Sequence, residues 1–292
     1  MNHPAELTLA QYMTDAANGE AVMSDATIEK IGKDVMDALK RQFGGGTKRK
    51  DFALRMSNVG RPSCQLWFQK NRPNEATPLP SNFVMNMMLG DIEEAIFKGL
   101  LTEAQVAFED ADHVALEIPE ADVTINGTYD IAIDGAVDDI KSASDWSYRN
   151  KFKSFASLKE SDSFGYVGQL AGYAQASGLK AGGWWVINKA NGSFKYIPAN
   201  GLDMVEELYK IKKTALAVQS DKLERCFDAV DEVFNGKKTG NKILGSECSW
   251  CSYRHACWPT LKELPALKSR AKEPKTVSYV HIKGEDNDER VS

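Results

Sequence analysis

The sequence has 292 residues, enough for one large domain or two small ones. Hydrophobic residues make up 42% of the chain and charged residues 26%, and no apolar run approaches the roughly 20 residues that span a bilayer. The net charge of −5 argues against a broad electrostatic coating of DNA, although it leaves room for a local basic groove. The N-terminus lacks a basic segment followed by an apolar core, so we expect a cytoplasmic protein with no secretory signal and no membrane partner.

The first part of the chain is predicted to be helical. Residues 1–43 carry apolar residues at helical spacing, and three glycines then end the pattern. The basic run at residues 47–51 is interpreted as an exposed, solvated loop. Ser63 is predicted to cap a short helix that carries Cys64. Cys64 itself is either a small buried apolar residue or a metal ligand.

A longer helix is predicted from Phe83 to Leu101, with its apolar residues on one side. Gly90 lies one turn before Glu94, so the missing side chain leaves room beside that carboxylate. Asp91 and Glu93 are interpreted as part of a solvated acidic face. Residues 104–125 alternate in polarity and are predicted to form the first strands of a sheet.

The stretch from Gly127 to Lys141 is predicted to be a β-hairpin that turns at Asp134 and Gly135. Side chains in a strand repeat every two residues, so Asp139 and Lys141 should point the same way. With Asp130 on the neighbouring strand, this pattern suits a divalent metal beside a cationic group, which would act on a phosphodiester. A surface ion pair is the ordinary alternative.

Basic and aromatic residues interleave between Ser142 and Lys159, as they do in surfaces that hold single-stranded nucleic acid. Arg149, Lys151 and Lys153 are the candidate nucleic-acid ligands in this segment. An amphipathic linker with scattered lysines explains the pattern equally well.

The next segments are predicted to alternate between helix and strand. A helix from Phe164 to Ser177 places Gln169 and Tyr173 on one face, because these residues are four apart. Strands at residues 183–188 and 193–198 form a hairpin. One or two helices at residues 202–235 are expected to bury Cys226 as a structural core residue.

Three of the five cysteines cluster near the C-terminus, as Cys248, Cys251 and Cys257. Ligands this close in sequence converge on one metal at little cost in chain entropy, so the spacing predicts a metal site. The fourth ligand is open: His255 would complete a tetrahedral zinc site, and Cys64 an all-thiolate iron–sulfur cluster.

Together, these motifs resemble the PD-(D/E)xK nuclease superfamily in its RecB-like branch. The resemblance covers roughly residues 54–259 and rests on the order Gly90-x-x-x-Glu94, Gly127-x-x-Asp130, Asp139-x-Lys141 and Gln169-x-x-x-Tyr173. One cysteine before these motifs and three after them resemble the AddB-like exonucleases of bacteria and phages, which carry a four-cysteine iron–sulfur cluster. The fold that this implies is α/β, a central mixed β-sheet flanked by helices like that of restriction endonucleases, with the helical N- and C-terminal parts joined by the cluster.

The expected organisation has three parts. Residues 1–53 form an N-terminal helical region, and residues 54–264 form the nuclease domain with its cluster. Residues 265–292 are charged, contain proline and are predicted to be a disordered tail.

The resemblance also implies ligands for Mg²⁺ or Mn²⁺. Glu94 stands where these nucleases often carry a histidine, and this departure leaves open whether Glu93 or Glu94 is the ligand. Asp130 would be the central carboxylate and Asp139 the third ligand, and the carbonyl of Ile140 would complete the set. Both metals favour such oxygen ligands.

The remaining motif residues are implied to act on the substrate. Lys141 would orient the attacking water or stabilise charge in the transition state, and Gln169 and Tyr173 would position Lys141 and the DNA. The four ligands of the [4Fe–4S] cluster would be Cys64, Cys248, Cys251 and Cys257.

The resulting expectation is a metal-dependent DNA exonuclease in phage or bacterial recombination, repair or DNA processing. It would act in the bacterial cytoplasm, with a helicase, a recombinase or a single-strand-binding protein as partner, and a homo-oligomer stays open. The alternative is a catalytically inactive DNA-binding or assembly subunit with a structural zinc or iron–sulfur site.

Overall fold

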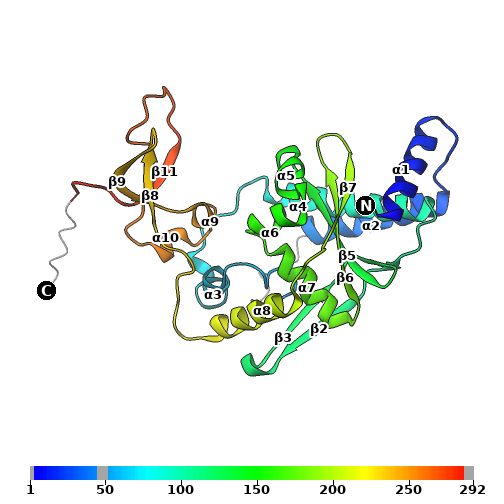
Figure 1. The fold of residues 1–292 in the computed structure, drawn as a ribbon, viewed down its shortest axis with the longest axis horizontal. Helices are drawn as coiled ribbons and strands as arrows, with labels where there is room; N and C mark the ends of the chain where they lie inside the picture. The colour runs from blue at the N-terminus through cyan, green and yellow to red at the C-terminus, as the bar shows by residue number, and fades with distance from the viewer. Residues whose placement is uncertain (1–2, 45–51, 286–292) are drawn as a thin grey trace. The chain divides into compact units, whose positions relative to one another are not determined.

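The structure, a computed structural model, describes residues 3–44 and 52–285. The chain divides into two compact units, one made of Met1–Arg61 with Pro80–Leu216 and the other of Pro62–Leu79 with Ala217–Ser292 (Figure 1). Each unit is described by itself. The basic run predicted as a loop at residues 47–51 lies outside the described residues.

The first unit is an α/β fold built on a mixed sheet. Its main helices are α1 (Pro4–Ala17), α2 (Asp25–Phe43), α4 (Phe83–Glu103), α5 (Asp145–Arg149), α6 (Phe155–Glu160), α7 (Tyr166–Ser177) and most of α8 (Met204–Gln219), with short 3₁₀ turns η2 (Pro119–Ala121) and η3 (Lys151–Lys153). Its strands are β1 (Glu109–Asp110), β2 (His113–Ile118), β3 (Val123–Thr128), β4 (Ile131–Ile133), β5 (Ala136–Ala143), β6 (Lys180–Asn188) and β7 (Phe194–Pro198).

Five of these strands form the central sheet in the order β1-β4-β5-β6-β7. Strands β5 and β6 run parallel, and the other neighbours in this sheet run antiparallel. A parallel pair needs a long crossover, which α5, α6 and α7 supply. Strands β2 and β3 form a separate antiparallel hairpin.

The β4–β5 hairpin has the two-residue turn that the sequence predicts. Ile133 pairs with Ala136, and the turn residues Asp134 and Gly135 have φ values of 50° and 73°. Positive φ at both positions is characteristic of a type I′ turn, for which Asp-Gly is a preferred pair. The turn fixes the register and therefore the face that each β5 side chain occupies.

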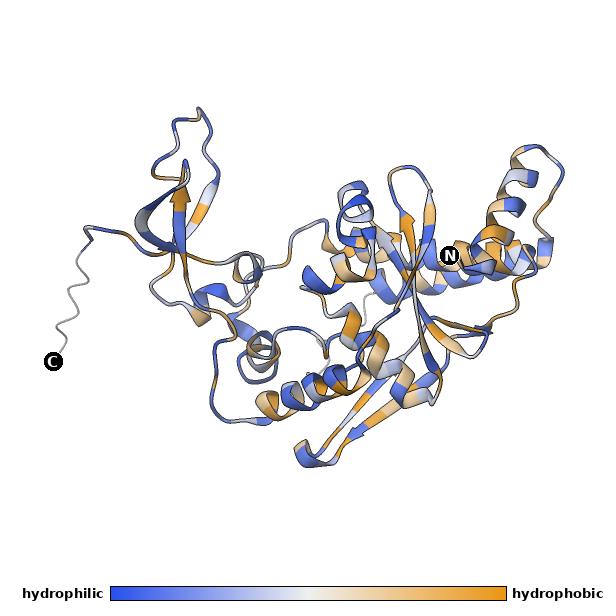
Figure 2. Cartoon of the chain, viewed as in Figure 1, coloured by the Kyte–Doolittle hydropathy of each residue, from blue (hydrophilic) through white to orange (hydrophobic). Residues whose placement is uncertain are grey.

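Helices cover both faces of the central sheet. On one face, α1 and α4 pack onto the strands through a buried apolar cluster of Ala5, Leu9, Phe97, Leu101, Ala104, Ile131, Ile133, Ile140 and Trp185. On the other face, Phe155 of α6 stacks on Trp184 of β6 with 5.8 Å between ring centroids. Figure 2 shows apolar residues in orange along the central strands and the adjoining helices. The predicted α/β class with a mixed sheet flanked by helices is confirmed.

Leu101→Ala is expected to lower the free energy of unfolding by about 2–5 kcal/mol, because the side chain is fully buried in this cluster and its loss leaves a cavity. Leu89, on the same helix, is 37% exposed, and Leu89→Ala should cost far less. Urea unfolding followed by tryptophan fluorescence compares the two variants. Equal losses would contradict this placement of the core.

Two distant backbone segments of the first unit touch at Gly60 and Gly165. A Cβ atom added to either glycine would collide with the backbone of the other. Gly165 also has φ of +78° where it precedes α7, a conformation that other residues rarely adopt. Both positions therefore require glycine.

The second unit combines short helices with an antiparallel sheet. The helices are α3 (Ser63–Asn71), η1 (Pro73–Glu75), α9 (Ser246–Ser249) and α10 (Arg254–Cys257). The strands are β8 (Val230–Phe234), β9 (Lys237–Ile243), β10 (Lys262–Pro265) and β11 (Thr276–His281), and they lie in the order β10-β11-β9-β8.

This unit corrects three predictions. Residues 265–292 were expected to be disordered, but β11 pairs with β10 and β9, and the Tyr279 hydroxyl donates to Glu232 Oε1 over 2.7 Å. The strand around Tyr279 has only six residues and lies between charged segments, so the composition of this region does not indicate it. Residues 230–234 form a strand where a helix was predicted. The predicted domain at 54–264 is divided between the two units.

In the part of the chain that the structure describes, no helix is both long enough and apolar enough to cross a membrane.

Candidate active site and cysteine cluster

Strand β5 places Asp139 and Lys141 on one face, as the period of two predicts. Lys141 Nζ lies 2.6 Å from Asp139 Oδ1 and 2.5 Å from Oδ2. Both side chains are largely buried, and Asp139 Oδ2 has no hydrogen-bond partner despite its closeness to the ammonium. The two residues therefore form a buried ion pair, unlike an ordinary surface pair.

Asp130 joins this pair from the neighbouring chain segment. Its Oδ2 accepts a hydrogen bond of 2.7 Å from the backbone N–H of Ile140. That bond holds the carboxylate against β5, next to Asp139. The Ile140 side chain points the opposite way, into the apolar cluster under α1 and α4.

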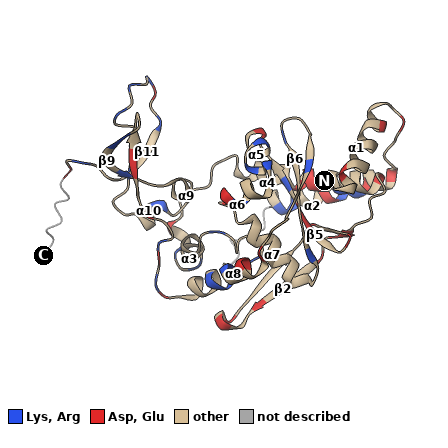
Figure 3. Cartoon of the chain, viewed as in Figure 1, with Lys and Arg blue, Asp and Glu red and all other residues tan. Residues whose placement is uncertain are grey.

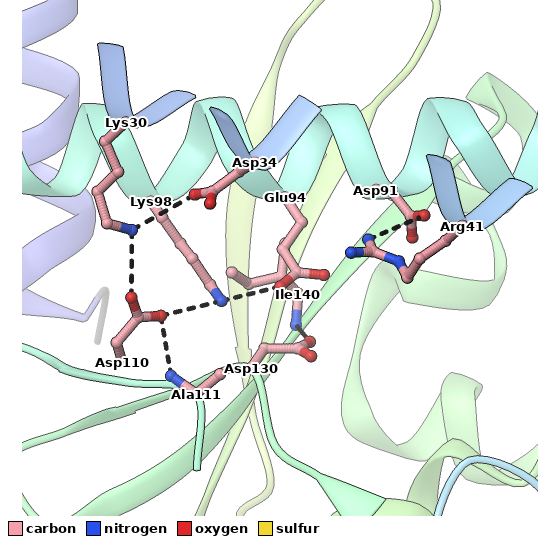
Figure 4. Close-up of polar contacts among 10 residues, drawn as sticks. All are labelled: Lys30, Asp34, Arg41, Asp91, Glu94, Lys98, Asp110, Ala111, Asp130 and Ile140. Atoms are coloured by element: carbon pink, nitrogen blue, oxygen red, sulfur yellow. Dashed lines mark hydrogen bonds and ion pairs between the residues drawn. The ribbon is translucent and has the colours of Figure 1, made fainter. Parts of the chain in front are cut away.

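Helix α4 contributes Glu94, which lies beside Asp130 and Ile140 in Figure 4. Glu94 Oε1 is 2.9 Å from Lys98 Nζ, and Lys98 also reaches Asp110 Oδ1 at 3.2 Å. Lys98 is buried, and its ammonium offsets part of the negative charge of these two carboxylates. Asp91, one turn earlier, pairs instead with Arg41 at 3.2 Å.

The three carboxylates raise one another's pKa. Burial first and Asp139 second raise the pKa of Asp130 to about 6. Burial likewise raises the pKa of Asp139, where Glu94 adds to it, and of Glu94, where Asp130 adds to it. Burial alone would lower the pKa of Lys141, but Asp139 and Asp130 outweigh it, so the pKa stays above its usual range and the ammonium stays charged. The site thus gathers negative charge that a cation would relieve.

These residues fit Mg²⁺ or Mn²⁺ in donor chemistry, since all the candidate ligands are oxygen atoms. Within residues 3–44 and 52–285, however, no three His, Cys, Asp or Glu side chains are already arranged as metal ligands. Glu94 is instead paired with Lys98, and Asp139 with Lys141.

Helix α7 carries Gln169 and Tyr173 on one face, as predicted. Gln169 Nε2 lies 3.4 Å from the Tyr173 hydroxyl. Burial first, with smaller contributions from Asp139 and Asp130, raises the pKa of Tyr173 to about 12. Gly127 makes room for the Tyr173 ring, because a Cβ there would lie 2.7 Å from the Tyr173 Cε1 atom.

The predicted nucleic-acid ligands do not form one exposed strip. Arg149 is exposed and pairs with Asp145 at 2.9 Å, and Lys153 is exposed beyond it. Lys151 is only 8% exposed, and its Nζ lies 4.5 Å from the centroid of the Tyr166 ring. Basic and acidic residues intermingle along the helices of this unit in Figure 3.

Sequence reasoning missed the role of Asp138, which it treated as a neighbour of the site. Asp138 is buried on the opposite face of β5 and accepts hydrogen bonds from the Gly183 N–H at 2.8 Å, Trp185 Nε1 at 3.1 Å and the Tyr196 hydroxyl at 2.8 Å. Burial raises its pKa to about 6 despite these bonds. A Cβ at Gly182 would collide with the carboxylate, so a glycine is required there.

Asp138→Ala is expected to destabilise the first unit by about 3 kcal/mol or more, because three buried donors lose their acceptor. Asp138→Asn keeps one acceptor oxygen and should lose less. Urea unfolding at neutral pH measures both losses. If both Asp138→Ala and Asp138→Asn unfold at the same urea concentration as wild type, the structural role given to Asp138 is wrong.

All five cysteines belong to the second unit. The Cys64 backbone N–H donates to Cys226 Sγ over 3.1 Å, and Ser63 Oγ lies 3.4 Å from the same sulfur. Ser63 therefore does not cap α3, whose N-cap is Pro62. Cys226 is exposed, so its predicted place in the core is wrong. Hydrogen bonding with Cys64 lowers the pKa of Cys226 to about 6.

Cys251 and Cys257 pack against an apolar cluster of Trp67, Phe68 and Tyr253, and Cys248 precedes them on α9. Burial raises the pKa of all three, that of Cys248 to about 11, and neighbouring cysteines add to the shifts. His255 points to Glu263, 3.5 Å away. The thiols fit a soft metal or an iron–sulfur cluster in donor type.

No protein-family model matches the sequence, and neither does any curated protein. Among solved structures, the chain is similar to the crystal structure of SSO0001, with a TM-score of 0.42 and 13% sequence identity over 80% of this chain and 96% of that one. At this TM-score the likeness has no consequence for fold or function.

Proposed function

We propose that this chain is a divalent-metal-dependent deoxyribonuclease that hydrolyses phosphodiester bonds from DNA ends. The observation that carries the proposal is the buried group of Glu94, Asp130 and Asp139 beside a charged Lys141. Buried carboxylates that raise one another's pKa are costly to the fold, and such clusters occur where chemistry needs them. The resemblance of the motif order to RecB-like nucleases supports the same conclusion.

The carboxylates of Glu94, Asp130 and Asp139 and the carbonyl of Ile140 are the groups that would hold Mg²⁺ or Mn²⁺. When bound, such an ion lowers the pKa of a coordinated water and neutralises charge on the phosphate. Asp130 is held in place by its bond to the Ile140 N–H, so this ligand is oriented in advance.

The other side chains act on the substrate directly. Lys141 keeps its proton, so its ammonium can donate to a phosphate oxygen or orient the attacking water. Asp139 holds that ammonium in position through the contact at 2.6 Å. Tyr173 and Gln169 contact each other and would fix the position of Lys141 and the DNA strand.

We further propose that Cys64, Cys248, Cys251 and Cys257 hold a [4Fe–4S] cluster. The second unit joins Pro62–Leu79 to the C-terminal segment, so Cys64 shares a compact unit with the other three. The cluster would act as a structural staple between these segments, around a nuclease core like that of restriction endonucleases. Zinc, with His255 as fourth ligand, is the alternative cofactor.

A catalytically inactive DNA-binding subunit is the second candidate. The observation that favours it is the pairing of Glu94 with Lys98 and of Asp139 with Lys141. Such ion pairs neutralise two of the three carboxylates without a metal. In this case, cleavage would come from a partner such as a helicase–nuclease or a recombinase system in a bacterium or phage.

The proposal is tested with protein purified under anaerobic conditions, end-labelled linear DNA and a covalently closed circle, each with Mg²⁺, Mn²⁺ or EDTA. Loss of the linear DNA alone, and only with metal, is the expected result. Cleavage of the circle as well would make the enzyme an endonuclease. If wild type and Asp130→Asn leave both substrates intact, the binding-subunit candidate replaces the proposal.

A further inference from the structure

Three aromatic rings form a stack beside the candidate active site. Tyr166, the first residue of α7, lies nearly parallel to Phe164, with 5.6 Å between ring centroids and an interplanar angle of 12°. Tyr166 also stacks with Phe152, at 6.0 Å and 24°. Phe152 is buried, whereas Phe164 is 54% exposed. The stack thus runs from the interior of the first unit to an open outer ring.

The stack begins at the candidate catalytic lysine. Lys141 Nζ lies 5.1 Å from the centroid of the Tyr166 ring. Tyr166 therefore contacts both the ammonium of Lys141 and the outer ring of Phe164.

A second lysine, Lys151, also lies beside these rings. Lys151 Nζ is 4.5 Å from the Tyr166 centroid and 4.8 Å from that of Phe164. Lys151 thus adds positive charge next to both rings.

The nearest carboxylate is already engaged. Asp162 lies 4.0 Å from Lys151 Nζ, at the limit of an ion pair. Its two oxygens accept hydrogen bonds from the backbone N–H groups of Gly165, Tyr166 and Val167, at 2.8–2.9 Å. Asp162 thus caps α7 and leaves the charge of Lys151 only partly balanced.

We propose that Phe164 is a stacking platform for a nucleobase next to the scissile phosphate, and that the buried charge of Lys151 beside this ring favours an anionic strand. An exposed ring that is backed by further rings and flanked by a lysine matches both the aromatic face and the anionic backbone of a nucleic-acid strand. Bases in a duplex are already stacked on their neighbours, so the platform favours a strand with an unpaired end. This inference rests on the proposed function for its placement of the phosphate.

The test is binding in EDTA, so that no cleavage occurs, with fluorescently labelled single-stranded and blunt duplex oligonucleotides. Phe164→Ala should weaken single-strand binding roughly 5- to 150-fold, the range for loss of one base stack, with a much smaller effect on the duplex. Phe164→Tyr should bind like wild type, because it keeps the ring. Tyr209, which is 65% exposed on α8, supplies the matched control Tyr209→Ala, which should change nothing.

A strand with abasic positions near its end provides a second readout. Wild type should bind this strand as weakly as Phe164→Ala binds the normal one. Equal binding of the normal strand by wild type and Phe164→Ala overturns the inference. Failure of wild type to bind any strand, or an equal loss in Tyr209→Ala, also overturns it.

The inference and the proposed function fail separately. Binding that depends on Phe164 without cleavage in Mg²⁺ or Mn²⁺ would leave the platform standing and remove the nuclease. Cleavage of linear DNA by wild type, together with unchanged DNA binding by Phe164→Ala, would support the nuclease and rule out the stacking platform.

Discussion

Lys141→Ala is expected to abolish metal-dependent cleavage of linear DNA, with a fall in rate of roughly 10²–10³-fold or more, the range for removal of one group that stabilises transition-state charge. Lys141 is the buried cation in contact with Asp139, and its raised pKa keeps it charged at neutral pH. Removal of the ammonium also takes away a charge that lowers the pKa of Asp130 and of Asp139. Both pKa values should therefore rise further, and the affinity of these carboxylates for a metal should change.

The measurement is the initial rate of loss of end-labelled DNA at saturating Mg²⁺ or Mn²⁺. The matched control is Lys180→Ala, an exposed lysine at the start of β6, which should keep the wild-type rate. Circular dichroism checks that Lys141→Ala is folded. A Lys141→Ala protein with full activity would refute the assignment of the site.

If the proposed iron–sulfur cluster is bound, Cys257→Ser is expected to remove most of the iron. It should also lower the melting temperature of the second unit by roughly 10 °C or more, because metal binding is coupled to folding and a unit of this size loses about 4–8 °C per kcal/mol. The physical reason is that the cysteines lie on short segments with little core of their own, around Trp67, Phe68 and Tyr253. Iron analysis, the visible absorption spectrum and a thermal melt measure the effect.

Cys226→Ser is the matched control, since this exposed thiol is not among the four implied ligands. It should keep its iron and its brown colour. The ligand assignment is wrong if Cys226→Ser loses iron while Cys64→Ser retains it. A colourless wild type whose bound zinc is lost in His255→Ala would establish the zinc alternative.

The sequence predicted the parts of the site that depend on local periodicity. Asp139 and Lys141 share a face because strand side chains alternate, and Asp134 with Gly135 forms the turn that sets the register. Gln169 and Tyr173 meet because they are four apart on a helix. Each of these relations is contained within a few residues, so no knowledge of the tertiary fold is needed.

The relations that sequence reasoning missed are long-range. Cys64 and Cys226 are 162 residues apart, and nothing near either one indicates the contact. Lys151 was read as an exposed ligand, but the rings of Phe164 and Tyr166 lie over it, and the structure reveals this only through tertiary packing. The role of Asp138 likewise depends on Trp185 and Tyr196 from two other strands.

The contact between Gly60 and Gly165 has a consequence for how this fold varies. Most residue pairs in contact tolerate compensating substitutions, in which a larger side chain at one position is accepted because the side chain at the other becomes smaller. Here neither partner can shrink further, and any Cβ meets backbone. Across related sequences, this contact should therefore appear as two fixed glycines without correlated changes, and methods that find contacts from paired substitutions would pass over it.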